Sequence, residues 1–95
     1  MRELLEIFLE ETPKQLTVLE NAIHNADGPG VENAAHTLKG ELGYLGLAES
    51  AALARDLERM GRERELQSAP EAFRRFKSGL KAASEAMHES LVQNR

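Results

Sequence analysis

A histidine, a lysine and two glycines have residue types and spacing that could carry out chemistry: His36, Lys39, Gly40 and Gly43. Apolar residues recur at helical spacing through the surrounding segment, at Val31, Ala34, Leu38, Leu42 and Leu45. On a helix with about 100° per residue, these apolar residues share one side, and His36 points to the opposite, solvent-facing side. Gly40 and Gly43 fall within about 40° of His36. The sequence therefore predicts an exposed imidazole with two glycines beside it.

The two glycines need a physical reason, because each destabilises a helix interior by about 1 kcal/mol relative to alanine. Helical side chains lean toward the N-terminus, so a side chain at position 40 or 43 would lie over the ring of His36. Glycine at both positions leaves the imidazole accessible to an approaching partner. We therefore interpret the two glycines as residues that provide access.

The chemistry that suits this arrangement is the acceptance of an anionic group. An imidazole with an ordinary pKa of about 6.5 is mostly unprotonated near neutral pH, so its free nitrogen is a nucleophile without an activating base. Lys39 lies one turn beyond His36 and places a cation beside the ring. We interpret His36 as a phosphoryl acceptor and Lys39 as the charge partner of the phosphoryl oxygens.

The same residues carry a resemblance to a known family. The run His36-Thr37-Leu38-Lys39-Gly40, followed by Gly43 and Leu45-Gly46, resembles the signature of histidine phosphotransfer (HPt) domains, the shuttles of phosphorelays. The segments 8–13 and 47–61 and the total length of 95 residues extend the resemblance over nearly the whole chain. Glu41 departs from the family pattern, which more often has a small residue there. Because Glu41 lies off the His36 face of the helix, we expect it to alter the flank of the site and not to disable it.

The resemblance implies a mechanism and partners. The outer nitrogen of His36 would attack an aspartyl phosphate on a receiver domain of a response regulator, and a second receiver would then take the group. An HPt domain has no kinase activity of its own, and magnesium belongs to the receiver, so no cofactor or metal is expected in this chain. The resemblance also implies a cytoplasmic monomer, either free-standing or the C-terminal domain of a membrane-bound hybrid sensor kinase.

Composition is compatible with this function. The 95 residues are enough for one domain, and the predominance of Leu and Ala predicts an all-α fold. The absence of cysteine excludes disulfides and thiolate metal sites. A formal net charge of -4 disfavours nucleic acid as a partner, since binding to phosphates needs a basic surface. No run of about 18 apolar residues exists, so no insertion into a membrane is expected.

Local signals predict an antiparallel up-and-down four-helix bundle with a short additional N-terminal helix. Thr12 and Pro13 have the types expected of an N-cap and first helical residue, Asp27 to Gly30 carries the strongest turn signal, and Gly46 is placed to end a helix. The predicted helices are about 2–11, 13–26, 30–45, 48–63 and 69–92. The second of these is expected to bury Leu16, Leu19, Ile23 and Ala26.

Other polar and aromatic residues are weaker candidates. Tyr44, Glu32 and Asn33 lie close enough to His36 on its helix to contact a docking partner, although ordinary exposed residues would have the same pattern. His24 and His88 lack the neighbouring glycines and cation, and three dispersed histidines give no metal-ligand spacing.

Two other functional classes remain open at this point. One is the phosphoacceptor helix pair of a sensor kinase, but the acidic residue and the proline that typically follow its histidine are absent after His36. The other is a bundle that binds or inhibits a receiver domain without accepting phosphate. Its docking surface would be the same, so only phosphate labelling separates it from a shuttle. A metal-dependent enzyme is disfavoured because no ligand cluster or acid-base set is present.

Overall fold

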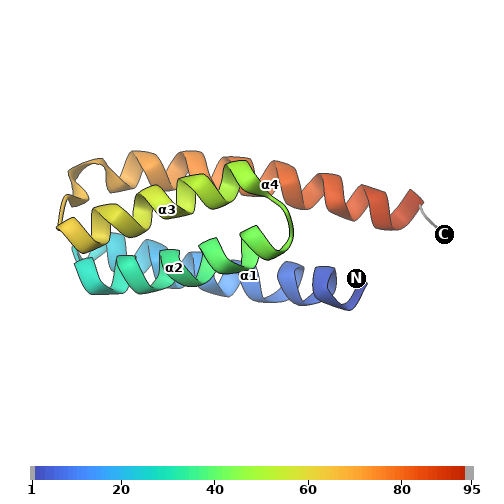
Figure 1. Ribbon diagram of the computed structural model, residues 1–95, viewed down its shortest axis with the longest axis horizontal. Coiled ribbons are helices and arrows are strands. Elements are labelled where there is room, and N and C mark those ends of the chain that lie inside the picture. Colours follow the sequence, from blue (N-terminus) through green and yellow to red (C-terminus); the bar gives the residue numbers. More distant parts are fainter. Residues whose placement is uncertain (1, 94–95) are drawn as a thin grey trace.

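The computed structural model describes residues 2–93, with the side chains of residues 2–5, 7–9, 87–88 and 90–93 outside the description. The elements are α1 (Arg2–His24), α2 (Gly28–Tyr44), α3 (Ala48–Glu63), a 3-10 turn η1 (Leu66–Ser68) and α4 (Ala69–Gln93). Successive helices run in opposite directions and pack into an elongated bundle of 46 × 19 × 19 Å (Figure 1). The predicted all-α antiparallel four-helix bundle is confirmed.

Because the helices are unequal in length, one part of the bundle contains all four helices and the remainder contains only α1 and α4. The hairpin of α2 and α3 covers only part of the two longer helices, and α1 and α4 extend beyond the turn between α2 and α3 (Figure 1). Of all the helix pairs, α2 and α3 pack against each other most extensively. A group placed between these two helices therefore lies within the most extensive helix–helix contact of the described fold.

The core lies along the axis, and all four helices contribute to it. Its largest fully buried side chains are Phe76, Leu19, Leu38, Leu42, Leu57, Leu80 and Val31. Burying one such side chain stabilises a fold by about 1.5–3 kcal/mol. The apolar stripe that the sequence predicts on α2 is confirmed, since Val31, Ala34, Leu38 and Leu42 are all buried and Leu45 is partly buried against them. The opposite side of α2, which carries His36, faces outward.

The N-terminal segment differs from the sequence prediction. The predicted short helix 2–11 and the helix predicted to begin at residue 13 form one continuous helix, α1, with Pro13 inside it. Thr12 is buried, and its hydroxyl has no hydrogen-bond partner among the described residues, so it does not cap a helix. The fixed φ angle of proline suits a helix, but inside one proline removes a hydrogen bond and its ring crowds the carbonyl one turn earlier, so α1 continues through Pro13 despite this cost. The local capping signal was therefore misleading.

The connection between α1 and α2 also corrects the sequence prediction. Ala26 is exposed with a φ of 53°, and the buried residue at this end of α1 is Ala22. Asp27 caps α2, because its side-chain oxygen accepts a hydrogen bond from the backbone N–H of Gly30 at 3.1 Å. Thus α2 begins at Gly28, inside the segment for which the sequence predicts a turn.

The turn between α2 and α3 has the glycine stop that the sequence predicts. Gly46 has a φ of 78°, in the left-handed region. The backbone N–H of Leu47 donates to the carbonyl of Leu42 at 2.9 Å, and that of Gly46 donates to Gly43 at 3.1 Å. These bonds satisfy carbonyls at the end of α2 and reverse the chain. As a result α3 runs back along α2 beside His36.

Candidate functional site

The imidazole of His36 projects from α2, with 66% of its side chain exposed, yet one of its nitrogens contacts a carboxylate on α3. Nδ1 lies 2.8 Å from Oε2 of Glu58 on α3. An ionised carboxylate can only accept a hydrogen bond, so in the neutral ring Nδ1 carries the proton and Nε2 carries the lone pair. Nε2 has no partner among the described residues. The contact with Glu58 thus leaves Nε2, the outer nitrogen, as the ring nitrogen with a free lone pair.

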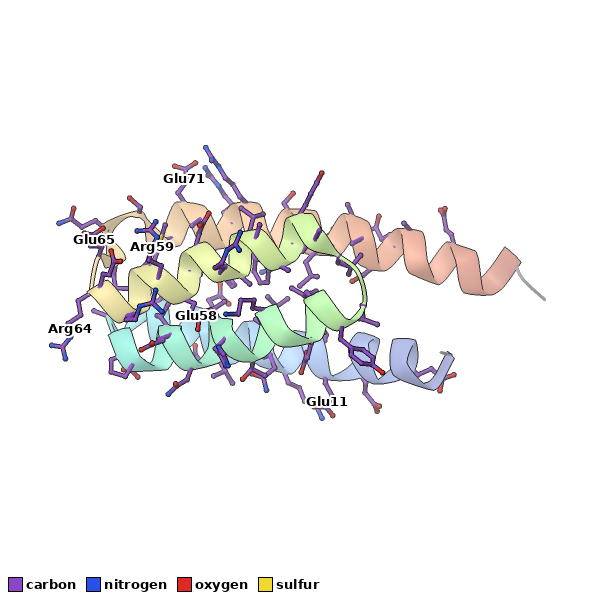
Figure 2. All side chains as sticks on the ribbon, viewed as in Figure 1. Glu11, Glu58, Arg59, Arg64, Glu65 and Glu71 are labelled. Carbon is purple, nitrogen blue, oxygen red and sulfur yellow. The ribbon has the colours of Figure 1, made fainter. Side chains whose placement is uncertain are left out.

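Glu58 contacts a second residue of the site. Its other oxygen, Oε1, lies 2.7 Å from Nζ of Lys39. The carboxylate is buried between α2 and α3, where Figure 2 shows it, and the whole residue is only 8% exposed. One carboxylate from α3 therefore joins the two polar residues of α2 that the sequence singles out.

The charge of Glu58 is maintained by these contacts. The hydrogen bond from Lys39 lowers the pKa of Glu58 below its ordinary value of 4.5, burial acts in the opposite direction, and the hydrogen bond from His36 lowers the pKa further. The net direction is downward, so the carboxylate is ionised at neutral pH. An ionised Glu58 is the form that accepts hydrogen bonds from both partners.

Glu58 is the site residue that sequence reasoning missed. The ammonium of Lys39, interpreted from the sequence as the charge partner of the phosphoryl oxygens, pairs with Glu58 in the unphosphorylated domain. One signal could have identified Glu58. It lies on the same side of α3 as Ala54, Leu57 and Gly61, all of which are buried. An acidic residue within such a stripe requires a cation or donor from another helix.

The close approach of α3 to α2 depends on a buried glycine. Gly61 lies one turn beyond Glu58, and a Cβ atom there would lie only 2.6 Å from the backbone nitrogen of Glu32 on α2. A side chain at position 61 would hold the two helices apart. The short distance between the helices lets the side chain of Glu58 reach both His36 and Lys39.

The two glycines beside His36 are in open space. Gly40 and Gly43 are exposed, and a Cβ atom built on either would have no other heavy atom within 4 Å. Neither glycine is therefore required by packing. This arrangement agrees with the interpretation that both positions provide access to the ring.

The weaker candidates are not joined to His36 by hydrogen bonds in the described part of the chain. Tyr44 is 76% exposed at the end of α2. The backbone carbonyl of Asn33 accepts a hydrogen bond from the Thr37 hydroxyl at 3.2 Å, and Glu32 is half-buried. His24 is exposed, and the side chain of His88 lies outside the described residues.

Glu41 lies in an acidic environment on the flank of the site. It is half-buried. Burial raises the pKa of Glu41, and the nearby charge of Glu11 on α1 raises it as well. Its carboxylate therefore adds an unfavourable charge interaction between α1 and α2, separate from the contacts of His36.

Two properties of the described residues bear on other functions. Within residues 2–93, the described side chains include no group of three or more His, Cys, Asp or Glu arranged to hold a metal ion. None of the described helices combines the length and the apolar character needed to cross a bilayer.

Comparison with known proteins gives two matches. The family model "Hpt domain" matches residues 3–87. The fold resembles the crystal structure of histidine-containing phosphotransfer protein B (HptB) from Pseudomonas aeruginosa PAO1, with a TM-score of 0.92 and 24% sequence identity over 97% of this chain and 80% of that one. Comparison with curated protein sequences gives no match. Because the family model covers most of the chain, this protein belongs to the Hpt domain family, the histidine phosphotransfer domains of phosphorelays.

Proposed function

We propose that His36 is the phosphoacceptor of this domain and that Nε2 is the nucleophilic atom. The observation that supports this most directly is the 2.8 Å contact between Nδ1 and Glu58, on a ring that is otherwise 66% exposed. The contact fixes the proton on one nitrogen and directs the lone pair of the other toward solvent. A partner can therefore approach the reactive atom without any rearrangement of the bundle.

The reaction is a transfer between two acceptors. The lone pair of Nε2 attacks the phosphorus of a receiver's aspartyl phosphate, the bond from phosphorus to the aspartyl oxygen breaks, and its electron pair returns to the aspartate carboxylate. Nδ1 keeps its proton, facing Glu58, and the positive charge that develops on the ring is stabilised by the carboxylate. The reverse step delivers the group to a second receiver. The domain is a carrier without kinase activity of its own, and it uses the magnesium of the receiver.

The surface around His36 would select the partner. Gly40 and Gly43 leave the ring accessible, and the exposed Tyr44 and Asn33, together with Glu32, are proposed to contact the receiver. A transient complex of this kind needs only a modest interface. We further propose that the chain acts as a cytoplasmic monomer, either alone or attached to a hybrid sensor kinase.

Phosphate labelling tests the proposal. A receiver carrying labelled aspartyl phosphate is mixed with the wild-type domain, with His36→Gln and with the matched variant His24→Gln. We expect acid-labile label on the wild type and on His24→Gln and none on His36→Gln, while circular dichroism shows all three to be helical. Label on His36→Gln would refute the assignment. A wild type that binds the receiver but takes no label would support the non-phosphorylated binding bundle instead.

A further inference from the structure

We propose that Arg55, on α3, is a residue that determines which receiver binds, because its guanidinium pairs with a carboxylate of that partner. This inference rests on the proposed function, in which a receiver approaches His36. It adds a contact from α3 to the surface of α2 that was described above.

Arg55 lies at a hollow on the side of the hairpin that carries His36. The hollow has a volume of about 400 Å³ and is lined by Lys39, Arg55 and glycine and alanine residues of the α2–α3 hairpin. Lys39 follows His36 at a spacing of three residues, so the hollow begins one turn from the ring. Even a small interface of about 600 Å² per partner, centred on His36, is wide enough to extend over it.

The shape of the hollow leaves room for the guanidinium to move. Apart from Lys39 and Arg55, the residues that line it have no side-chain atom beyond Cβ. A Cβ atom built on Gly43 or Gly46 would have no other heavy atom within 4 Å. Arg55 is exposed, so its long side chain can turn toward a group that enters the hollow.

The charge of Arg55 is not paired within the described part of the chain. Three other arginines there each pair with a glutamate about one turn away on the same helix: Arg59, Arg74 and Arg75. The equivalent partner of Arg55 would be Glu58, three residues further on. However, the two oxygens of Glu58 already contact His36 at 2.8 Å and Lys39 at 2.7 Å. Among the described residues, Arg55 therefore presents an unpaired cation beside the site of transfer.

The receiver supplies the complementary charge. It binds the magnesium that the transfer uses, and proteins hold Mg²⁺ mainly with carboxylates, so the receiver surface that meets His36 is acidic. The domain has a formal net charge of -4, which repels such a surface. An unpaired arginine at the hollow offsets this repulsion locally and favours receivers that have a carboxylate opposite it.

Binding of a cognate receiver tests the proposal without any transfer of phosphate. Titration calorimetry in the presence of Mg²⁺ gives the dissociation constants of wild type, Arg55→Gln, Arg55→Glu and the control Arg59→Gln, which removes an exposed arginine from the same helix. We expect Arg55→Gln to bind about fivefold more weakly, which is the most that one exposed ion pair typically contributes. Arg55→Glu should bind more weakly still, and Arg59→Gln should match the wild type. Equal dissociation constants for Arg55→Gln and Arg59→Gln would overturn the proposal.

Ionic strength shows whether the contact is electrostatic. At a salt concentration of about 0.5 M, screening should bring the dissociation constants of wild type and Arg55→Gln together. A fivefold difference that persisted there would overturn the proposal, because Arg55 would then act by packing and not by charge.

Variants of the receiver identify the carboxylate. The acidic residues around its phosphorylated aspartate are replaced, one at a time, by the corresponding amides. With one of these receivers, we expect wild type and Arg55→Gln to bind within about twofold of each other, since the partner of the guanidinium is gone. A full effect of Arg55→Gln with every receiver variant would contradict a pair of charges.

The transfer assay separates a failure of this proposal from a failure of the proposed function. At saturating concentrations of the domain, Arg55→Gln should accept label at the wild-type rate, because Arg55 acts on association. A much slower rate at saturation would overturn the docking role. If the wild type binds the receiver but takes no label, the proposed function of His36 fails, and the dissociation constants alone decide the role of Arg55. Circular dichroism establishes that each variant is folded.

Discussion

Gly28 on α2 and Gly61 on α3 bring the backbones of the two helices into direct contact. A Cβ atom on Gly61 would lie 2.7 Å from the carbonyl oxygen of Gly28, and one on Gly28 would lie 2.8 Å from the carbonyl oxygen of Gly61. Both glycines are buried. The helices are therefore closer here than any pair of side chains would allow. This contact is next to Glu58 in α3, so it sets how closely that carboxylate approaches α2.

Gly61→Ala should test this contact. Alanine gains about 1 kcal/mol of helix propensity, but the new methyl group would overlap backbone atoms and force α2 and α3 apart. We expect a net destabilisation of about 1–3 kcal/mol in urea unfolding, together with slower phosphotransfer because Glu58 is displaced. Gly79→Ala on α4 is the matched control, since a Cβ atom there meets nothing within 4 Å, and it should be stabilising. Equal stability of the two variants would contradict the steric argument.

Gly40 should tolerate a small side chain but not a long one. A Cβ atom at this exposed helical position has open space around it, so Gly40→Ala should stabilise the fold by up to about 1 kcal/mol and transfer normally. Gly40→Gln should fold equally well but cover the ring, because its side chain leans back toward His36. Transfer rates and urea unfolding of both variants check this prediction. If Gly40→Gln transferred phosphate at the wild-type rate, the argument that Gly40 keeps the ring of His36 accessible would fail.

The ion pairs of Glu58 should make the stability of the bundle depend on pH in a known direction. Because the pKa of Glu58 is lowered on folding, its contribution is complete above the ordinary value of 4.5 and is lost as the pH falls below that value through the pKa of the folded state. Glu58→Gln should therefore be less stable than the wild type near neutral pH, and the difference should shrink below pH 4.5.

Urea unfolding of wild type and Glu58→Gln over this pH range measures the effect. Glu63→Gln is the control, because Glu63 pairs with Arg59 at 3.4 Å on the surface, where both side chains are 45% exposed. Such a pair contributes about 0–1 kcal/mol. A difference between wild type and Glu58→Gln that stays constant as the pH falls would show that the charge of Glu58 does not stabilise the fold.

The sequence is sufficient to predict structural features that depend on a single helix. The spacing of Val31, Leu38 and Leu42 predicts which side of α2 is buried, and hence that His36 faces outward. Gly46 predicts the end of that helix, because few other residues adopt its backbone conformation readily. These features follow from periodicity and backbone conformation, which act over one or two turns.

The sequence predictions fail where contacts between helices determine the structure. Thr12 and Pro13 have the composition of a helix start, yet the Thr12 side chain is buried and α1 continues through both residues. The link between His36 and Glu58 spans 22 positions in the chain and depends on how closely α3 packs against α2. No local pattern specifies that distance, so the role of the carboxylate emerges only from the packed bundle.

The location of His36, Lys39 and Glu58 on one helical hairpin has a consequence for folding kinetics. A loop of 22 residues closes with a small entropic penalty, and local helix pairing lowers the contact order of the fold. His36, Lys39 and Glu58 can therefore meet as soon as α2 and α3 pair, while α1 and α4 cover the apolar side of the hairpin. In native-state hydrogen exchange, we expect the amides around Leu38 and Leu57 to open together as one cooperative unit. Separate opening of the two helices would show that the hairpin is not an independent folding unit.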